Sequence, residues 1–230
     1  VLFRSIDFQL SSAGGNLYSF ALSGLSGECK VPSNVNIRFL TCTINSITNT
    51  FNNVFYFKDC TFKDEGEYTI TGASCIFDHC TFDASFNFNA CKVELLNDCS
   101  INKDLNLNST SLESTRCTFK SEKGLNAIYA KDGSRVISNL DFYEGWTETL
   151  WKAENDSYIK ISKPSSISKI KKSFCNIATR SALDIYDASS LKIEEGDAAV
   201  AAFTLDDNCV LSLSNIFNIN VKANIIKSTK

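Results

Sequence analysis

The sequence predicts an all-β fold: a single right-handed parallel β-helix of about ten coils, each of roughly 20 residues. Three observations predict it. A three-residue element recurs at near-constant spacing, a second column of small residues shares its period, and the stretches between them alternate with period two. Helical periodicity is weak throughout, and β-branched and aromatic residues dominate the alternating stretches.

The first column repeats a cysteine, a hydroxyl residue and a large apolar residue. Its copies are Cys42-Thr43-Ile44, Cys60-Thr61-Phe62, Cys80-Thr81-Phe82, Cys99-Ser100-Ile101 and Cys117-Thr118-Phe119, at intervals of 18, 20, 19 and 18 residues. We expect Leu140-Asp141-Phe142 and Cys175-Asn176-Ile177 to continue it, after 23 and 35 residues. Stacked coils about 4.8 Å apart would bury the large residues in one ladder and point the hydroxyl residues outward.

A second column opens an alternating strand with a small residue. Its copies are Ser74-Cys75-Ile76, Cys91-Lys92-Val93, Ser111-Leu112-Glu113, Ser134-Arg135-Val136, Ser157-Tyr158-Ile159, Ser190-Leu191-Lys192 and Cys209-Val210-Leu211. A further short alternation, such as Phe86-Asn87-Phe88 or Leu105-Asn106-Leu107, precedes it across a turn. Each period therefore holds three short strands.

The pattern loosens in two places. Residues 143–153 are expected to form a longer coil, and the interval between Ser157 and Ser190 is expected to hold an extra coil or a protruding loop near residues 163–172. We interpret residues 1–230 as one β-helix domain of a longer chain. A β-sandwich is the rival fold, but it would not explain a fixed repeat.

The repeated pattern resembles the pectin-lyase-like right-handed β-helix superfamily over nearly the whole chain, in pattern and period. The resemblance implies an architecture. Enzymes of that superfamily cleave glycosidic bonds with paired acids, or eliminate across uronic acids with calcium and a basic residue. The carboxylates weighed for such a role are Asp184 with Asp187, and Asp206 with Asp207, although the superfamily's accompanying histidine, glycine and arginine motifs are missing.

Two other groups are candidates for binding. Tyr143, Trp146 and Trp151 form an aromatic cluster that would be either a sugar-stacking platform or packing beneath a loop, with Trp151 favouring the core. Lys169, Lys171 and Lys172, together with Lys163, form the one basic cluster. They predict either a solvated loop or a contact for an acidic glycan or phosphate.

Cysteine and histidine give no metal site or cofactor. We expect the cysteines to be free buried thiols, although stacked neighbours fall within disulfide range, and five thiols in a line offer no tetrahedral cage. Reduced thiols favour synthesis in the cytoplasm, as an intracellular protein or a virion component. His79 is the only histidine and is expected to be a solvated surface residue.

The net charge of −3 favours neither nucleic acid nor an anionic membrane as partner, and no apolar run approaches the roughly 18 residues of a membrane span. The leading hypothesis is a non-enzymatic structural or recognition module, the shaft of a fibre, tail spike or adhesin-like protein, trimeric and binding a surface glycan or protein. Two alternatives remain: a carbohydrate-active enzyme, and an intracellular scaffold that polymerises end to end.

Overall fold

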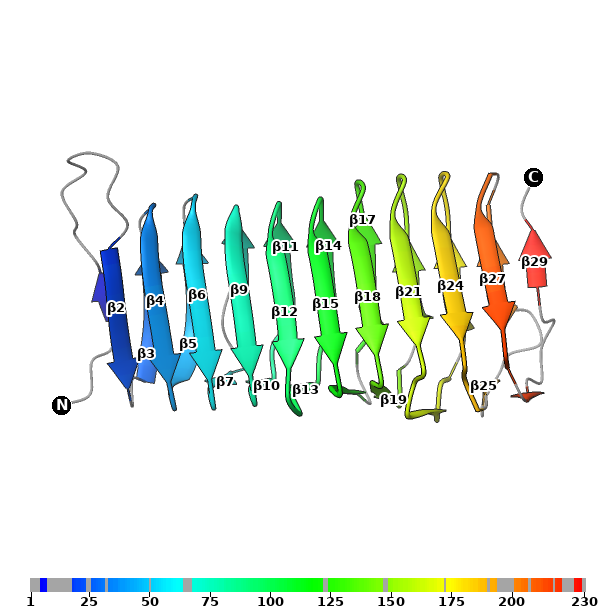
Figure 1. The fold of residues 1–230 in the computed structure, drawn as a ribbon, viewed down its shortest axis with the longest axis horizontal. Helices are drawn as coiled ribbons and strands as arrows, with labels where there is room; N and C mark the ends of the chain where they lie inside the picture. Colours follow the sequence, from blue (N-terminus) through cyan, green and yellow to red (C-terminus); the bar gives the residue numbers. More distant parts are fainter. Residues whose placement is uncertain are drawn as a thin grey trace.

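The computed structural model confirms the all-β parallel β-helix. It describes residues 5–7, 18–23, 26–31, 33–49, 51–63, 68–121, 124–146, 149–171, 173–189, 191–193, 201–206, 208–216, 218–220 and 226–228. These residues contain 29 strands and no helix, and their strands pair in parallel. In Figure 1 the near strands run down and the far strands run up while the chain advances from one end to the other, which is a right-handed winding.

One wall of the solenoid is a ten-stranded sheet, which takes one strand from each of about seven regular turns and three more from the less regular ends. Its members are β2 (Tyr18–Ser23), β4 (Val35–Leu40), β6 (Asn53–Lys58), β9 (Ala73–Asp78), β12 (Lys92–Leu96), β15 (Ser111–Thr115), β18 (Arg135–Asn139), β21 (Tyr158–Ser162), β24 (Ala182–Tyr186) and β27 (Val210–Ser214). These strands stand side by side along the near face in Figure 1.

The remaining walls form a seventeen-stranded sheet and one two-stranded pair. The larger sheet contains β1 (Ser5–Asp7), β3 (Ser26–Val31), β5 (Thr43–Asn49), β7 (Thr61–Phe62), β8 (Tyr68–Thr71), β10 (Thr81–Phe82), β11 (Phe86–Asn89), β13 (Ser100–Ile101), β14 (Leu105–Asn108), β16 (Thr118–Lys120), β17 (Asn126–Lys131), β19 (Phe142–Glu144), β20 (Thr149–Ala153), β22 (Ser166–Ser168), β23 (Ser173–Ile177), β26 (Phe203–Leu205) and β29 (Ile226–Ser228). The pair is β25 (Leu191–Lys192) with β28 (Ile219–Asn220).

The structure has about seven regular turns, somewhat fewer than the ten predicted. The six coils from β6 to β23 each carry three described strands in the two large sheets, and β4 with the long β5 adds a seventh. The next coil departs from this pattern because β25 pairs with β28 outside the large sheets. The coil number expected from the sequence is therefore corrected, while the fold class holds.

The core follows from the period-two alternation. Strands such as β6 and β9 bury every second residue, and in-register pairing stacks the buried residues of successive coils. The rings of Phe39, Phe57 and Phe77 stack at centroid distances of 4.8 and 4.7 Å, and the planes of neighbouring rings are nearly parallel, 9° apart. Such pairs add about 0.5–1.5 kcal/mol each beyond the burial of their area. The core is thus a continuous apolar column along the axis.

Sharp corners connect the strands with a residue in the left-handed region. Asp59, His79, Asp98 and Arg116 follow the ten-stranded sheet with φ between 53 and 62°. Their backbone N–H groups donate to carbonyls at the strand ends of the next coil, as Asp59 does to Asp78 at 3.0 Å. The buried residue after each corner also needs polar partners, because the corner interrupts the sheet ladder.

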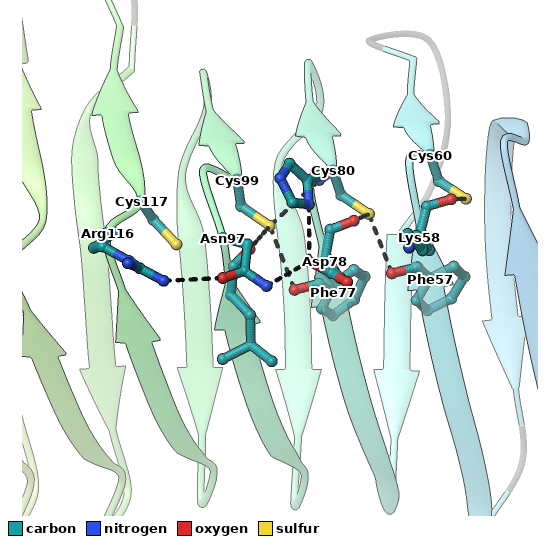
Figure 2. Close-up of polar contacts among 12 residues, drawn as sticks. Phe57, Lys58, Cys60, Phe77, Asp78, Cys80, Asn97, Cys99, Arg116 and Cys117 are labelled. Atoms are coloured by element: carbon teal, nitrogen blue, oxygen red, sulfur yellow. Dashed lines mark hydrogen bonds and ion pairs between the residues drawn. The ribbon is translucent and has the colours of Figure 1, made fainter.

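The buried cysteine column supplies those partners. The thiol of Cys99 donates to the carbonyls of Phe77 and Leu96 at 3.4 and 3.2 Å, and its sulfur accepts from the N–H of Cys80 at 3.4 Å. Figure 2 shows the thiols of Cys60, Cys80, Cys99 and Cys117 in a row, the first three beside such carbonyls. All ten cysteines are free thiols, as predicted.

The other corner uses hydroxyl groups in the same way. The N–H of Thr110 donates to the Oγ of Ser134 at 3.0 Å, Ser134 to Ser157 at 3.2 Å, and Ser157 to Ser181 at 3.1 Å. Ser181 therefore holds the position that the sequence assigned to Ser190, since Tyr158 pairs with Ala182. That assignment was wrong because the coil from β21 to β23 is an ordinary one: the position one coil after Ser157 is reached at Ser181, and no extra coil lies between them.

Three further register assignments are corrected. Cys175 pairs with Trp151 on β20, so it belongs to another wall than Cys117. Ser74 and Ser111 lie one residue beyond the buried position, which Ala73 and Thr110 occupy in their coils. A fourth correction concerns Leu140-Asp141-Phe142, which was assigned one residue too early: Thr118 pairs with Phe142 and Phe119 with Tyr143, so the first column continues as Asp141-Phe142-Tyr143 and Leu140 is exposed.

Candidate functional site

The predicted aromatic platform is not at the surface. Tyr143, Trp146 and Trp151 are each fully buried, in a coil whose strands β19 and β20 pair in register with their neighbours. The ring of Tyr143 stacks on Phe119 at 4.9 Å, and the indole N–H of Trp146 donates to the carbonyl of Phe119 at 3.1 Å. The expectation that Tyr143 and Trp146 lie in an exposed loop is wrong, because this coil needs large rings to fill its interior. For Trp151 the core interpretation is confirmed.

The lysines of the predicted basic cluster do not form one free cationic patch. Lys169 pairs with Glu144, which also pairs with Lys120 at 3.0 Å. The hydrogen bonds from both lysines hold the pKa of Glu144 below its usual value. Lys163 is an exposed corner residue, Lys171 is half-buried, and Lys172 lies outside the described residues.

The candidate catalytic carboxylates lie on different walls. Asp184 is at the centre of β24, on the outer face of the ten-stranded sheet, and Asp187 is the corner residue after that strand. Asp206 follows β26 in the other large sheet and is exposed. Asp207 lies outside the described residues. The described carboxylates thus do not all share one site.

Other polar side chains lie near Asp184 on the outer face of the ten-stranded sheet. The phenol of Tyr158 donates to Asp184 at 2.6 Å, and burial together with this bond raises the pKa of Tyr158 to about 12. The guanidinium of Arg135 lies 5.9 Å from the Tyr158 ring centre, and Lys160 lies 5.1 Å from that of Tyr186. Sequence reasoning singled out Asp184 but not this group, because the group's members come from three separate coils.

His79 lies at the surface, as expected, and takes part in a small polar chain. Its Nδ1 is 2.9 Å from Asp78, which also accepts from Asn97 at 2.8 Å and from Tyr56 at 3.1 Å. Figure 2 shows Arg116 reaching Asn97 in turn, at 3.1 Å. The donors, led by Asn97, keep the pKa of Asp78 below its usual value. The acceptors are already partnered, which favours a role in fixing the corners.

A shallow polar groove lies on the outer face of the seventeen-stranded sheet. It crosses four coils, on strands β8, β11, β14 and β17, and its volume is about 250 Å³. Its lining residues are Thr69, Asn87, Asn89, Asn106, Asn108 and Lys131. These strands lie behind the near sheet in Figure 1. Four carboxamides therefore lie together in one groove.

The amides are placed by the strand register. Asn87 pairs with Asn106 and Asn89 with Asn108 across β11 and β14, so the four amides form two parallel columns along the axis. The large residues between them, such as Phe88 and Leu107, are buried and hold the backbone. Asn106 donates to Asn87 at 3.1 Å. Within the described residues, the amides of Asn89 and Asn108 have no protein hydrogen-bond partner and face solvent partly exposed.

At one end of the groove lies a group of side chains whose polar atoms already bond to one another. Next to Asn106 on the sheet, Tyr129 donates to Glu154 at 2.5 Å, and Lys152 pairs with Glu154 at 2.7 Å. The Lys152 ammonium also lies 4.3 Å from the centre of the Tyr129 ring. Lys131 is the only charged residue among the described residues that line the groove.

A separate polar group is buried inside the solenoid. Asp141 occupies a position of the cysteine column and is fully buried. It accepts from the N–H of Cys117 at 2.7 Å and from the hydroxyls of Ser114 and Ser138 at 2.5 and 2.6 Å, while Ser138 also contacts the phenol of Tyr143 at 2.6 Å. Burial raises the pKa of Asp141 despite these donors. Its closed surroundings favour a structural role.

Sequence reasoning missed the groove. The alternations Phe86-Asn87-Phe88 and Leu105-Asn106-Leu107 predicted strands through their buried apolar residues, and no role was assigned to the asparagines between them. The available signal was the outward residue type, asparagine in four outward positions of two successive coils. Asparagine is uncommon within strands, so its recurrence there indicates a surface requirement.

The fold and the groove define a parallel β-solenoid with an amide-lined outer face. Comparison with known proteins adds no family to this description: no family model, no curated protein and no solved structure matches the chain. Among the described residues no helix is long and apolar enough to cross a membrane, and no cluster of three or more histidine, cysteine or acidic residues is arranged to hold a metal ion.

Proposed function

We propose that the chain is a non-enzymatic structural and recognition module, the rigid β-helical shaft of a larger fibre, tail spike or adhesin-like protein that binds a surface glycan. The observation that carries the proposal is the amide groove on a regular stack of paired coils. Binding groups on rigid strands keep their geometry without an entropic cost of ordering on ligand association. The pectin-lyase-like resemblance of the repeat supports the same reading by analogy.

The amide groove suits recognition more than bond cleavage. Carboxamides donate and accept hydrogen bonds but do not exchange protons near neutral pH, so they bind hydroxyl groups without acting as acid or base. Among the described residues, no carboxylate lines the groove. Glycosidic cleavage needs two carboxyl groups on either side of the scissile bond.

The test is binding of the purified chain to an array of immobilised glycans. We expect selective binding to a subset of glycans, with the bound glycan recovered unchanged. The control is the variant pair Asn36→Ala with Asn139→Ala, which removes two outward amides from the ten-stranded sheet. Absence of binding to any glycan, or binding that this control removes, would contradict the proposal.

Light scattering under reducing conditions tests the shaft assignment separately. A trimer is the expected mass, because fibres and spikes with such shafts are commonly threefold assemblies. A monomer would remove the shaft assignment but leave glycan recognition standing. Open-ended polymers would favour the scaffold alternative.

A carbohydrate-active enzyme is the second candidate, favoured by one observation. The half-buried Asp184 accepts a hydrogen bond from Tyr158, and the cation Arg135 lies near the ring of Tyr158 on the same face. If this group were catalytic, Asp184→Asn would abolish cleavage of any glycan that the chain degrades. Unchanged cleavage in Asp184→Asn would exclude that residue, and absence of cleavage in the wild-type chain would favour the recognition module.

A further inference from the structure

The groove amides have hydrogen-bonding capacity left over. A carboxamide offers two donors and an acceptor with two lone pairs, and only one contact, from Asn106 to Asn87, joins two of the four. Asn89 and Asn108 carry no such contact within the described residues. A sugar hydroxyl both donates and accepts, so it complements a carboxamide in either orientation. The spare capacity matches a ligand rich in hydroxyl groups.

The charge of the groove narrows the ligand further. Acidic sugars are bound most strongly by arginine, which meets a carboxylate or sulfate with two parallel bonds. The described lining residues include no arginine, and Lys131 is the single cation among them, at the end beside the Tyr129 group. A carboxylate ligand placed over the amides would lose its hydration without gaining a cation partner, which is costly. The groove therefore favours a neutral ligand.

The strand register also sets the direction in which a polymer would lie in the groove. Along the axis, a ligand meets Thr69, Asn87 and Asn106 in one column, and Asn89 and Asn108 in the column beside it. Coils repeat about every 4.8 Å along this direction. Across the axis, a ligand would leave the sheet after two outward residues and reach the corner. A polymer with a short repeat meets equivalent groups only when it runs along the axis.

We propose that the groove binds a linear neutral polysaccharide whose chain runs along the solenoid axis, with about one sugar unit for each of the lining coils. This inference rests on the proposed glycan recognition and specifies its ligand. The sugar hydroxyls pair with the amide columns, and Lys131 marks the end of the site.

Isothermal titration with soluble linear oligosaccharides tests the inference. The probes are two length series, one of neutral β-linked glucose units and mannose units and one of oligogalacturonate. We expect binding to a neutral series that strengthens with length and levels off at about four units, with little dependence on salt. Asn89→Ala with Asn108→Ala should weaken it at least about tenfold, because each lost hydrogen-bond pair costs about 1 kcal/mol. The Asn36→Ala with Asn139→Ala control should bind like the wild type.

The outcomes separate this inference from the proposed function. Binding to oligogalacturonate alone, lost at high salt or in Lys131→Ala, would overturn the neutral ligand while leaving glycan recognition intact. Neutral binding that the Asn89 and Asn108 substitutions leave unchanged would overturn the site. Loss of all binding on both the array and the titration series would overturn the proposed function together with the inference. Circular dichroism of each variant checks that the fold is retained.

Discussion

At the scale of single residues, this solenoid depends on polar groups that satisfy the backbone at its corners and on a few exact fits in its interior. Pro164 illustrates the first. It follows the corner residue Lys163 and is buried, and the corresponding residue of the next coil is Ala188, which has no side-chain acceptor. Proline has no N–H to satisfy, so none is needed.

Gly124 is an example of an exact fit in the interior. A Cβ there would lie 2.3 Å from Cζ3 of Trp146, which is fully buried and held by its bond to Phe119. We predict that Gly124→Ala lowers the free energy of unfolding by about 1–3 kcal/mol, the usual cost of overpacking. Gly133→Ala is the control, since nothing lies within 4 Å of its added Cβ and only its φ of +76° opposes the change. Urea denaturation measures both, and equal losses would contradict the clash.

Asp141 gives a pH-dependent prediction. Its pKa is raised by burial in the folded chain, so the folded state binds the proton more tightly than the unfolded state. The wild type should therefore lose stability relative to Asp141→Asn as pH rises above about 4, the ordinary aspartate pKa, until the folded pKa is passed. Unfolding free energies at a series of pH values measure the difference. Parallel curves for the two proteins would show that Asp141 has an ordinary pKa.

At the scale of the structural element, each corner column is a repeated polar device made from whichever small side chain fits. Cysteine, serine and threonine hold the position, and aspartate does so once, in Asp141. A thiol both donates to carbonyls and accepts from an N–H, although weakly. This explains why residues that look like small hydrophobes recur at a position where valine does not.

The cysteine column predicts a difference between two substitutions at Cys99. Cys99→Ser keeps a donor and an acceptor, whereas Cys99→Val leaves the N–H of Cys80 and the carbonyls of Phe77 and Leu96 without this partner. We expect the valine variant to be less stable than the serine variant by about 1–3 kcal/mol, the cost of buried unpaired polar groups. Thermal and urea unfolding of the two proteins decide this. A valine variant as stable as the wild type would show that the column is merely apolar.

The sequence was sufficient to predict the positions of these elements where the coil length is nearly constant. The triplets from Cys42 to Phe119 stack as predicted, because a shift of one residue would turn every apolar side chain outward. Prediction failed at Cys175 and Ser190, because small residues occur on more than one wall and these two were matched to the wrong one. The groove escaped prediction for a different reason: outward side chains such as Asn108 are not constrained by packing.

At the scale of the whole molecule, the wall that contributes the largest buried side chains changes from coil to coil along the axis. Phe39, Phe57 and Phe77 fill one inner column, which then narrows to Ser114 and Ser138. The large rings Tyr143 and Trp151 enter from the opposite walls in those coils. Small buried residues on one wall thus share a coil with large rings on another, which is how an irregular sequence keeps a regular stack.

The stacking register is the central claim, because the core, the corner columns and the groove all follow from it. It is tested most directly by cross-linking cysteines placed at Ser74, Lys92 and Ser111, outward residues of three successive coils. Neighbouring in-register alpha carbons lie about 4.8 Å apart, within disulfide range, whereas the outer two lie about twice as far apart. After mild oxidation, mass spectrometry should find the disulfide in the Ser74→Cys, Lys92→Cys protein and in the Lys92→Cys, Ser111→Cys protein, but not in the Ser74→Cys, Ser111→Cys protein. A disulfide in the last protein alone, or in none of the three, would contradict the register.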